Sequence, residues 1–521
     1  MVLETPLTGA LLRSFRLFLA VAAFVPPLAA ALFLPVPLPV SDSLDYLGYA
    51  RSLHLAGTYA ATPAGPGMDR RPGREPLYPL LIAAAAQLSP PLARSLEECA
   101  EPAESCRAGY RTLVVVNALL LGGAALMTGL ALLALGQGGG AAMLGCLYVS
   151  ANLHMYKDLK YVLSDYLAVF LCAALTLLLA RRRWAGAGLA AAALSLTKIV
   201  FLPFGMLLSA VLAFRGQRLA ALCIALPLLG ANLGWMERNI AWFGVAGDGR
   251  DGLALSTREV FDRMTPEEHR AAWLWWLRGP GAGLARRALP PESWRRHDWD
   301  AADGFYLEGQ LTQPGRIVAD LMAQGADRTA AEAQVKTVVI RRILGEWRDY
   351  LATMPVLFYR GLWFDEFIVL GLPLLLWLLW RSARGQCWNR LLVLSPGLWS
   401  MAVYPAISLN IPRYQYTAVT CLALAAGLAW QLHRDAVAAR TLGGVQRSVG
   451  ARQQAIDAVA LAAAADADRD RQGNAAPALL DLAAQPLGGG SGGVAFQHRQ
   501  QHQEFLAAQT ADAVLLAQRP A

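Results

Sequence analysis

The chain has few charged residues. Only 16% of its 521 residues are Asp, Glu, Lys or Arg, and 55% are hydrophobic, whereas a soluble globular protein usually carries about 25% charged residues. The mean hydropathy is also positive. This composition excludes an ordinary soluble globule and indicates an integral membrane protein with several apolar helices.

Histidine and cysteine are sparse as well, with seven of each. No His/Cys spacing resembles a zinc site, and His54 and His154 stand alone. Most cysteines lie inside apolar runs, but Cys99 and Cys106 share a polar loop. They could form a small disulfide if that loop faces an oxidising compartment, or they could remain two free thiols.

The positive net charge does not require a nucleic-acid partner. The formal charge is +8 at pH 7, and the surplus is scattered over short loops between apolar runs. Basic residues accumulate in the cytoplasmic loops of membrane proteins, so topology accounts for the charge. We therefore predict membrane lipids as neighbours of the chain and no nucleic acid.

Apolar runs predict an all-α polytopic protein. A span needs roughly 20 apolar residues, and the chain offers about ten candidate runs, some of them short. These runs cover residues 13–40, 111–135, 139–156, 162–180, 184–197, 199–214, 218–243, 366–381, 389–408 and 414–432. The first run is long and contains proline, so we expect a retained span and not a cleaved signal peptide.

The basic loops predict which segments share the outer side. When the spans are threaded with the Arg-rich loops in the cytoplasm, the outer face receives the loops 41–110 and 157–161, the hairpin at Lys198, the segment 244–365 and the loop Asn410–Arg413. Residues with unusual chemistry therefore converge on one face of the membrane.

The first outer loop, 41–110, is expected to hold two interfacial helices. Ser41 or Asp42 can cap a helix over Ser43–Ala56, and Gly57 can end it. Leu77–Leu88 is apolar but too short to span with a margin, so a second interfacial helix is expected there. Asp42 and Asp45 lie one turn apart on the first of these helices.

The long outer segment 244–365 follows the seventh span. It interleaves tryptophans with charged residues, which is typical of the headgroup belt. Apolar residues near helical spacing predict an amphipathic helix over 331–351, either on the membrane surface or in the core of a small helical domain. Residues 433–521 are rich in Ala, Gln, Arg and Asp and predict a cytoplasmic tail, largely disordered or loosely helical.

Several short pieces, in this order, carry a family resemblance. They are DSLDYLGYARSL, GREPLYP, YVLSDYLAVF, ALSLTK, GWMERNIAWFG and NIPRYQY. With these pieces, residues 1–432 resemble the GT-C superfamily of membrane glycosyltransferases, in particular the branch of protein O-mannosyltransferases and bacterial aminoarabinose transferases. The tail after 432 departs from that pattern because it does not look like a folded extracytoplasmic domain.

The resemblance implies a bundle with its active site on the outer face of a bacterial cytoplasmic membrane. It implies transfer of a sugar, with inversion, from a polyprenyl-phosphate donor to a lipid, glycan or protein acceptor. In such families an acidic residue of the first outer loop acts as base or positions the acceptor. Asp42 matches that place, with Asp45 beside it, and Asp165 resembles the second acidic position.

Elementary chemistry assigns roles to further residues. A departing lipid phosphate gains negative charge, so fixed cations stabilise the transition state; Arg74, Lys198, Arg238 and Arg413 all fall on the outer side. Each could instead reach toward lipid headgroups. Tyr46, Tyr78, Tyr161, Tyr404 and Tyr414 could line the substrate site or serve as interface anchors.

Three alternatives stay open from the sequence. The acidic residues could share a divalent cation, although we assign no metal ligand and no certain cofactor. A transporter or flippase could also use these charges, yet transporters place ionisable groups near the midplane and often repeat their halves. No internal repeat is evident in this chain, and its unusual residues gather at one face. A non-catalytic scaffold is also possible. The large outer loops permit it, but the convergence of acidic and basic residues on one face does not require it.

Overall fold

The structure is a computed structural model that describes residues 6–39, 42–60, 74–99, 103–243, 251–326, 328–365, 367–385 and 387–471. Within those ranges every regular element is a helix, and no strand is present, which confirms the all-α prediction. The chain divides into two compact units, Met1–Val437 and Ala438–Ala521. Everything that concerns the candidate site lies in the first unit.

Four helices of the described chain are long and apolar enough to cross a membrane, by length and composition. They lie in α1 (Pro6–Phe33), in α5 (Arg107–Ala134) with the turn before it, in α11 (Arg218–Phe243) and in α21 (Trp388–Ile407). Shorter apolar helices are α3 (Leu77–Leu88), α8 (Asp165–Ala180), α9 (Trp184–Ser195) and α10 (Phe201–Phe214). These helices are compatible with the membrane protein that the composition predicts.

One predicted span is interrupted. The run 139–156 forms α6 (Gly139–Ser150) and α7 (Leu153–Asp158). Between them, the Asn152 side chain accepts a hydrogen bond from the backbone N–H of Met155 and caps α7. An asparagine that caps a new helix in this way ends the old one without any proline or glycine.

The apolar helices pack into one bundle. α5 contacts α1, α6 and α8, while α9 contacts α8 and α11. The approach of α9 to α11 depends on Gly188, because a Cβ at that position would lie 2.0 Å from the carbonyl oxygen of Cys223. Small residues allow such close approach between helices in membrane proteins. The bundle gives the polar loops at its end a rigid base.

The first outer loop forms α2 (Asp42–Ala56), α3 and α4 (Pro90–Glu98), which pack on one another. The predicted helix over Ser43–Ala56 is present and begins one residue earlier, and α3 has the predicted bounds. α4 was not predicted. Ser41, the other suggested cap of α2, lies outside the described residues.

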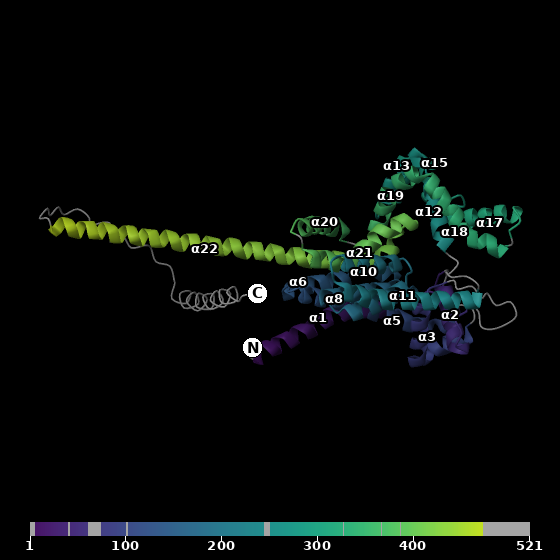
Figure 1. The fold of residues 1–521 in the computed structure, drawn as a ribbon, viewed down its shortest axis with the longest axis horizontal. Helices are drawn as coiled ribbons and strands as arrows, with labels where there is room; N and C mark the ends of the chain where they lie inside the picture. The colour runs from purple at the N-terminus through teal and green to yellow at the C-terminus, as the bar shows by residue number, and fades with distance from the viewer. Residues whose placement is uncertain are drawn as a thin grey trace. The chain divides into compact units, whose positions relative to one another are not determined.

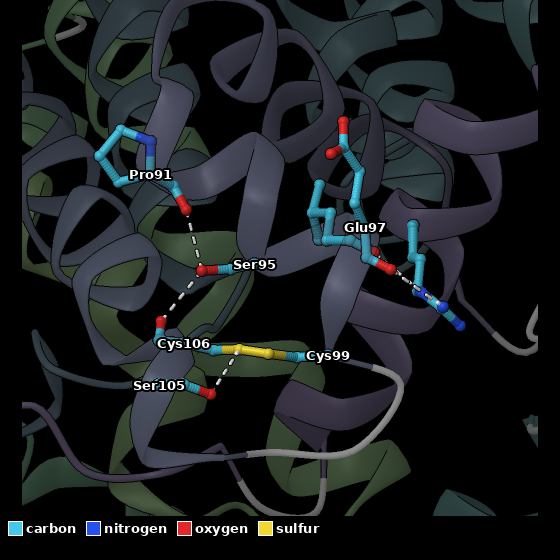
Figure 2. Close-up of a disulfide and its surroundings, with 8 residues drawn as sticks. Pro91, Ser95, Glu97, Cys99, Ser105 and Cys106 are labelled. Atoms are coloured by element: carbon cyan, nitrogen blue, oxygen red, sulfur yellow. Dashed lines mark hydrogen bonds between the residues drawn. A yellow bond between two sulfur atoms is a disulfide. The ribbon is translucent and has the colours of Figure 1, made fainter.

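A disulfide between Cys99 and Cys106 fastens this loop to α5 (Figure 2). Close to the bond, the Ser95 hydroxyl lies 2.9 Å from the carbonyl oxygen of Pro91 and 3.1 Å from that of Cys106. Of the two states that the sequence left open for this pair, the structure shows the disulfide. The end of α4 is therefore covalently fixed beside the start of α5.

The outer segment, residues 251–365, is a helical subdomain. Its helices are α12 (Asp251–Phe261), α13 (Pro266–Trp275), α14 (Gly281–Ala288), α15 (Pro291–Trp294), α16 (Phe305–Leu307), α17 (Gln313–Ala323), α18 (Arg328–Gly345) and α19 (Trp347–Leu362), with short turns η2 (Arg295–His297) and η3 (Glu308–Thr312). α18 packs beside α12 and α17 (Figure 1).

The predicted helix over 331–351 is two helices, since α18 and α19 meet at Glu346. The apolar stripe of α18 is buried within the outer segment, where Val335 and Val339 pack with Ile317 of α17. This packing corresponds to the small helical domain that the sequence left open.

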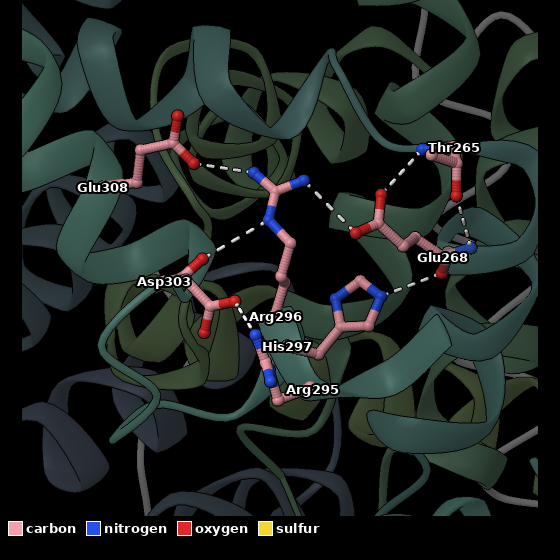
Figure 3. Close-up of polar contacts among 7 residues, drawn as sticks. All are labelled: Thr265, Glu268, Arg295, Arg296, His297, Asp303 and Glu308. Atoms are coloured by element: carbon pink, nitrogen blue, oxygen red, sulfur yellow. Dashed lines mark hydrogen bonds and ion pairs between the residues drawn. The ribbon is translucent and has the colours of Figure 1, made fainter. Parts of the chain in front are cut away.

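A network of charges holds the middle of the outer segment together (Figure 3). Glu268 completes a capping box with Thr265 at the start of α13 and accepts a bond of 3.2 Å from Arg296. Arg296 also donates to Glu308 at 2.6 Å. These bonds join α13, η2 and η3, and so fix the positions of Trp299 and Tyr306 between them.

The chain then returns to the bundle through α20 (Ile368–Arg384), α21 and the short helix η4 (Pro412–Ala418). The last described element, α22 (Val419–Arg471), begins in the bundle and contains residues of the second unit after Val437. The part of the expected tail up to Arg471 is therefore helical, and residues 472–521 lie outside the described ranges.

Candidate active site

A cavity of about 500 Å³ lies where the polar segments meet. The first outer loop contributes Asp42 and Arg74, the hairpin after α9 contributes Lys198, and the loop after α21 contributes Arg413. Trp299 and Tyr306 of the outer segment also line it. Residues from four of the five segments expected to converge, all except 157–161, thus line one cavity.

Asp42 is held between two arginines. Its Oδ1 accepts a hydrogen bond of 2.5 Å from Nη2 of Arg74, and its Oδ2 accepts one of 2.6 Å from Nη2 of Arg413. Asp42 is the first residue of α2, where the positive end of the helix dipole also favours a carboxylate. The Asp42 side chain is 31% exposed, so it is accessible from the cavity.

These contacts set the protonation state of Asp42. Burial alone would raise the pKa of the carboxyl group, but the charges and hydrogen bonds of Arg74 and Arg413 outweigh it and lower the pKa to about 2. Asp42 is therefore a carboxylate at neutral pH, and it is a weak base while both arginines are bound to it.

Asp45 has a supporting position. It lies in the first turn of α2 and accepts bonds from Arg74, 2.9 Å from Nη2 and 3.2 Å from Nε. It is not among the residues that line the cavity. Arg74 thus bridges both aspartates, and Asp45 fixes the orientation of its guanidinium.

The second acidic residue also has a cationic partner. Asp165 is the first residue of α8 and only 5% exposed, and its Oδ1 lies 2.9 Å from Nζ of Lys198. Burial would lower the pKa of Lys198, but the charge of Asp165 outweighs it and keeps that pKa well above its usual value. Asp165 is therefore paired with Lys198, a residue of the hairpin after α9.

Aromatic rings form much of the remaining wall. Tyr404 stacks on Tyr414 with ring centroids 5.3 Å apart, and the guanidinium of Arg74 lies over the ring of Tyr46 at 5.1 Å. The hydroxyl of Tyr46 also hydrogen-bonds Ser164 at 2.9 Å. Flat, rigid faces with a few polar groups are typical of small-molecule sites.

Three residues that the sequence proposed for the site, Tyr78, Tyr161 and Arg238, are not among the residues that line the cavity. Tyr78 is buried behind Tyr46 and donates to Asn117. Tyr161 lies under Lys160. Arg238 donates to the carbonyl oxygen of Tyr59 and lies over aromatic rings. The structure places Tyr78 in the core and Arg238 over the rings of Tyr59 and Trp235.

Sequence reasoning missed the lining residues of the outer segment. Trp299, Tyr306, Gln310 and Lys336 face the cavity, but the tryptophans were interpreted as a headgroup belt. Trp299 and Tyr306 stack, with centroids 3.6 Å apart. Their seven-residue spacing is the only local sign of that pairing, and it does not indicate a site.

The position of Arg413 depends on the outer segment. Asn410 has a positive φ of 48°, and its amide donates to the carbonyl oxygen of Leu357 in α19 at 2.8 Å. Asn410 also accepts from Gln415 at 2.7 Å. A Cβ on Gly361 would lie 2.1 Å from the Asn410 amide nitrogen, so α19 can come this close only with glycine there.

The described residues contain no group of three or more His, Cys, Asp or Glu side chains placed to hold a metal ion. Asp42 forms ion pairs with Arg74 and Arg413, and Asp165 forms one with Lys198. Comparison with known proteins adds no assignment, because no family model, no curated protein and no solved structure matches the chain.

Proposed function

We propose that the chain is a GT-C-type membrane glycosyltransferase, with about ten spans and its cavity at the outer face of a bacterial cytoplasmic membrane. It transfers a sugar from a polyprenyl-phosphate donor to an acceptor hydroxyl with inversion. The observation that carries the proposal is Asp42, a carboxylate accessible from the cavity and clamped by Arg74 and Arg413. The carboxylate can accept the proton of the acceptor hydroxyl, and the two arginines can stabilise the charge on the departing phosphate.

Arg74 and Arg413 suit a departing phosphate. An arginine fork binds phosphate oxygens in two parallel bonds. Nε of Arg413 is buried and has no hydrogen-bond partner among the described residues, so this arginine has a further N–H group that can donate to a phosphate oxygen. As the bond between sugar and phosphate breaks, charge develops on the phosphate, and cations held at that point lower the barrier.

The same arginines link donor binding to the base. Asp42 is a poor proton acceptor while its pKa is about 2, because a general base works best near the operating pH. A donor phosphate competes with Asp42 for the two guanidinium groups. When they turn to the phosphate, the Asp42 pKa rises toward its usual value, and the carboxylate can take the proton of the attacking acceptor hydroxyl.

The ion pair of Asp165 and Lys198 is a second charged group in the cavity lining. Lys198 is a compact positive charge in the lining, 18% exposed in its side chain, and can contact a phosphate oxygen or a sugar hydroxyl. Asp165 holds it in place through the 2.9 Å ion pair. We assign Asp165 a positioning role and Lys198 a substrate contact.

The test is a transfer assay with purified full-length protein and a radiolabelled polyprenyl-phosphate sugar. We expect Asp42→Asn to lower transfer by about 100-fold or more, the usual scale for loss of a general base, and Asp165→Asn to lower it less. Asp303→Asn is the matched control, because Asp303 pairs with Arg295 at an exposed site away from the cavity. It should leave transfer unchanged.

Two results would overturn the proposal. Full transfer by both Asp42→Asn and Asp165→Asn would remove these residues from the mechanism. Transport of a lipid-linked or polar substrate into vesicles, without any sugar transfer, would replace the class with a transporter or flippase.

A further inference from the structure

A buried arginine lies close to Trp299, one of the residues that line the cavity. Arg360 of α19 is only 8% exposed, and aromatic rings surround its guanidinium. The carbon of that group lies 4.5 Å from the ring centre of Trp276, 5.4 Å from that of Phe261 and 5.8 Å from that of Trp299. We call these three rings and Arg360 the arginine box.

Arg360 differs from two other arginines of the outer segment that are shielded from solvent. The buried Arg258 pairs with Asp262, and the half-buried Arg296 pairs with Glu268 and Glu308. Arg360 makes no hydrogen bond or ion pair with a residue that the structure describes, and its Nη1 is buried without an acceptor. Burial of the group lowers the pKa of Arg360 to about 9.

An unpaired buried cation is costly to keep. Aromatic faces attract a guanidinium, but they do not accept its in-plane N–H donors, which point past the ring edges. Removing a charge from water requires hydrogen-bonded partners as well as attraction if the cost is to be offset. A buried polar group without a partner calls for an explanation, and a bound ion that supplies the missing acceptor is one of them.

The box adjoins the cavity through one shared residue. Trp299 belongs to the box and also lines the cavity. Arg74 and Arg413 already donate hydrogen bonds to Asp42, whereas Nη1 of Arg360 is buried without an acceptor among the described residues. An anionic group beside Trp299 would therefore meet an Arg360 donor that no described residue occupies.

We propose that the arginine box is a binding site for an oxyanion, a carboxylate or phosphate group, which enters from the cavity beside Trp299. The planar fork of Arg360 donates two parallel hydrogen bonds to its oxygens, and the rings exclude water from the pair. The site is distinct from the Asp42 cluster, and it does not depend on sugar transfer. The group can belong to a soluble substrate or to a lipid headgroup.

The experiment measures thermal unfolding of the purified full chain in sodium phosphate, sodium acetate and sodium chloride at equal ionic strength. Wild type should be stabilised by phosphate or acetate relative to chloride. Arg360→Gln should need at least tenfold more of that anion for the same gain, and Arg360→Lys should fall between them. Arg296→Gln is the matched control, since Arg296 also lies over a ring, that of Phe305, but has acidic partners. Its gain should equal that of wild type.

Stability without added oxyanion provides the second measurement. Arg360→Gln should unfold at or above the temperature of wild type, because it removes an unpaired buried charge, whereas Arg296→Gln should unfold lower. Repeating the comparison in vesicles of phosphatidylcholine with and without phosphatidylglycerol separates the sources. A gain from phosphatidylglycerol that Arg360→Gln abolishes assigns a lipid headgroup, and a gain from the soluble anions alone assigns a soluble ligand.

Three results would overturn the proposal. The first is an undiminished oxyanion gain in Arg360→Gln. The second is loss of the gain in Arg413→Gln alone, which places the anion at the Asp42 cluster. The third is no gain in wild type together with a lowered unfolding temperature of Arg360→Gln, which shows that Arg360 serves only to pack the rings.

Discussion

Arg413 and Asp42 are 371 positions apart in the chain, yet Nη2 of Arg413 donates a 2.6 Å hydrogen bond to the Asp42 carboxylate. The contact joins the first outer loop to the loop before the last helix of the bundle. It also places a fixed positive charge at the group that we propose as the base.

If Arg413 binds the donor phosphate through its fork, Arg413→Lys should impair transfer although the charge is kept. A lysine offers a point charge and cannot make two parallel bonds. We expect a loss of about 100-fold in kcat, the scale for loss of one transition-state donor. Arg182→Lys, at an exposed arginine that contacts Asn389, should have wild-type kinetics. Wild-type kinetics in Arg413→Lys would contradict the assignment.

The pair of Asp165 and Lys198 should be coupled in stability. Asp165→Asn alone leaves a largely buried lysine without its partner and should lower the free energy of unfolding by about 3 kcal/mol. Adding Lys198→Met to that variant should restore part of the loss, because the unpaired charge is then gone. Denaturant unfolding of the two single variants and the double variant measures this coupling, and strictly additive losses would show that the ion pair contributes nothing.

His297 should make stability depend on pH. It is 5% exposed, and its Nε2 donates to the Glu268 carbonyl oxygen while its Nδ1 is buried without a partner. Burial, together with the nearby charges of Arg360 and Arg296, lowers the pKa of His297 from 6.5 to about 4. The unfolded chain therefore binds the proton first as pH falls.

Stability from neutral His297 is fully present above about pH 6.5 and should be lost as pH falls toward about 4, by up to about 3 kcal/mol. Unfolding measured across this range should show the slope in wild type. His297→Gln, which keeps an N–H donor for Glu268, should remove the slope, and His269→Gln should keep it, because His269 has an exposed bond to Ala352. An unchanged slope in His297→Gln would assign the effect to another group.

The Cys99–Cys106 disulfide should contribute to stability. It closes a short loop with a sequence separation of 7, for which the loop-closure estimate is about 2 kcal/mol. Reductant should lower the unfolding temperature of wild type but have no effect on a variant with Cys99→Ser and Cys106→Ser. If reductant leaves wild type unchanged, the bond is not present in the folded protein.

Local pattern was enough to predict some elements and not others. α3 was predicted with its observed bounds because prolines limit the apolar run on both sides. The break at Asn152 was missed because an asparagine inside an apolar run gives no sign that it caps a new helix. The break at Glu346 was also missed, although Gly345, a residue type common at helix ends, directly precedes it.

The same limit applies to the site. Asp42 and Asp165 could be selected from their local positions at the starts of α2 and α8. Composition alone could not distinguish their partners Arg413 and Lys198 from Arg238, since all three are basic residues that the sequence assigns to the same side. Arg238 lies in α11, over the rings of Tyr59 and Trp235. Tertiary packing decides which residues far apart in the chain form ion pairs, and the local sequence pattern does not indicate it.

The contact between Gly361 and Asn410 bears on how such a protein can be divided. Cutting out residues 244–365 would leave Asp42, Lys198 and Arg413 in the chain, but it would remove the Leu357 carbonyl and the Gly361 surface that hold Asn410 in place. The helices of the bundle alone therefore do not hold Arg413 in its observed position. Replacing the outer segment with a different sequence would therefore shift Arg413, although Arg413 itself would not be substituted.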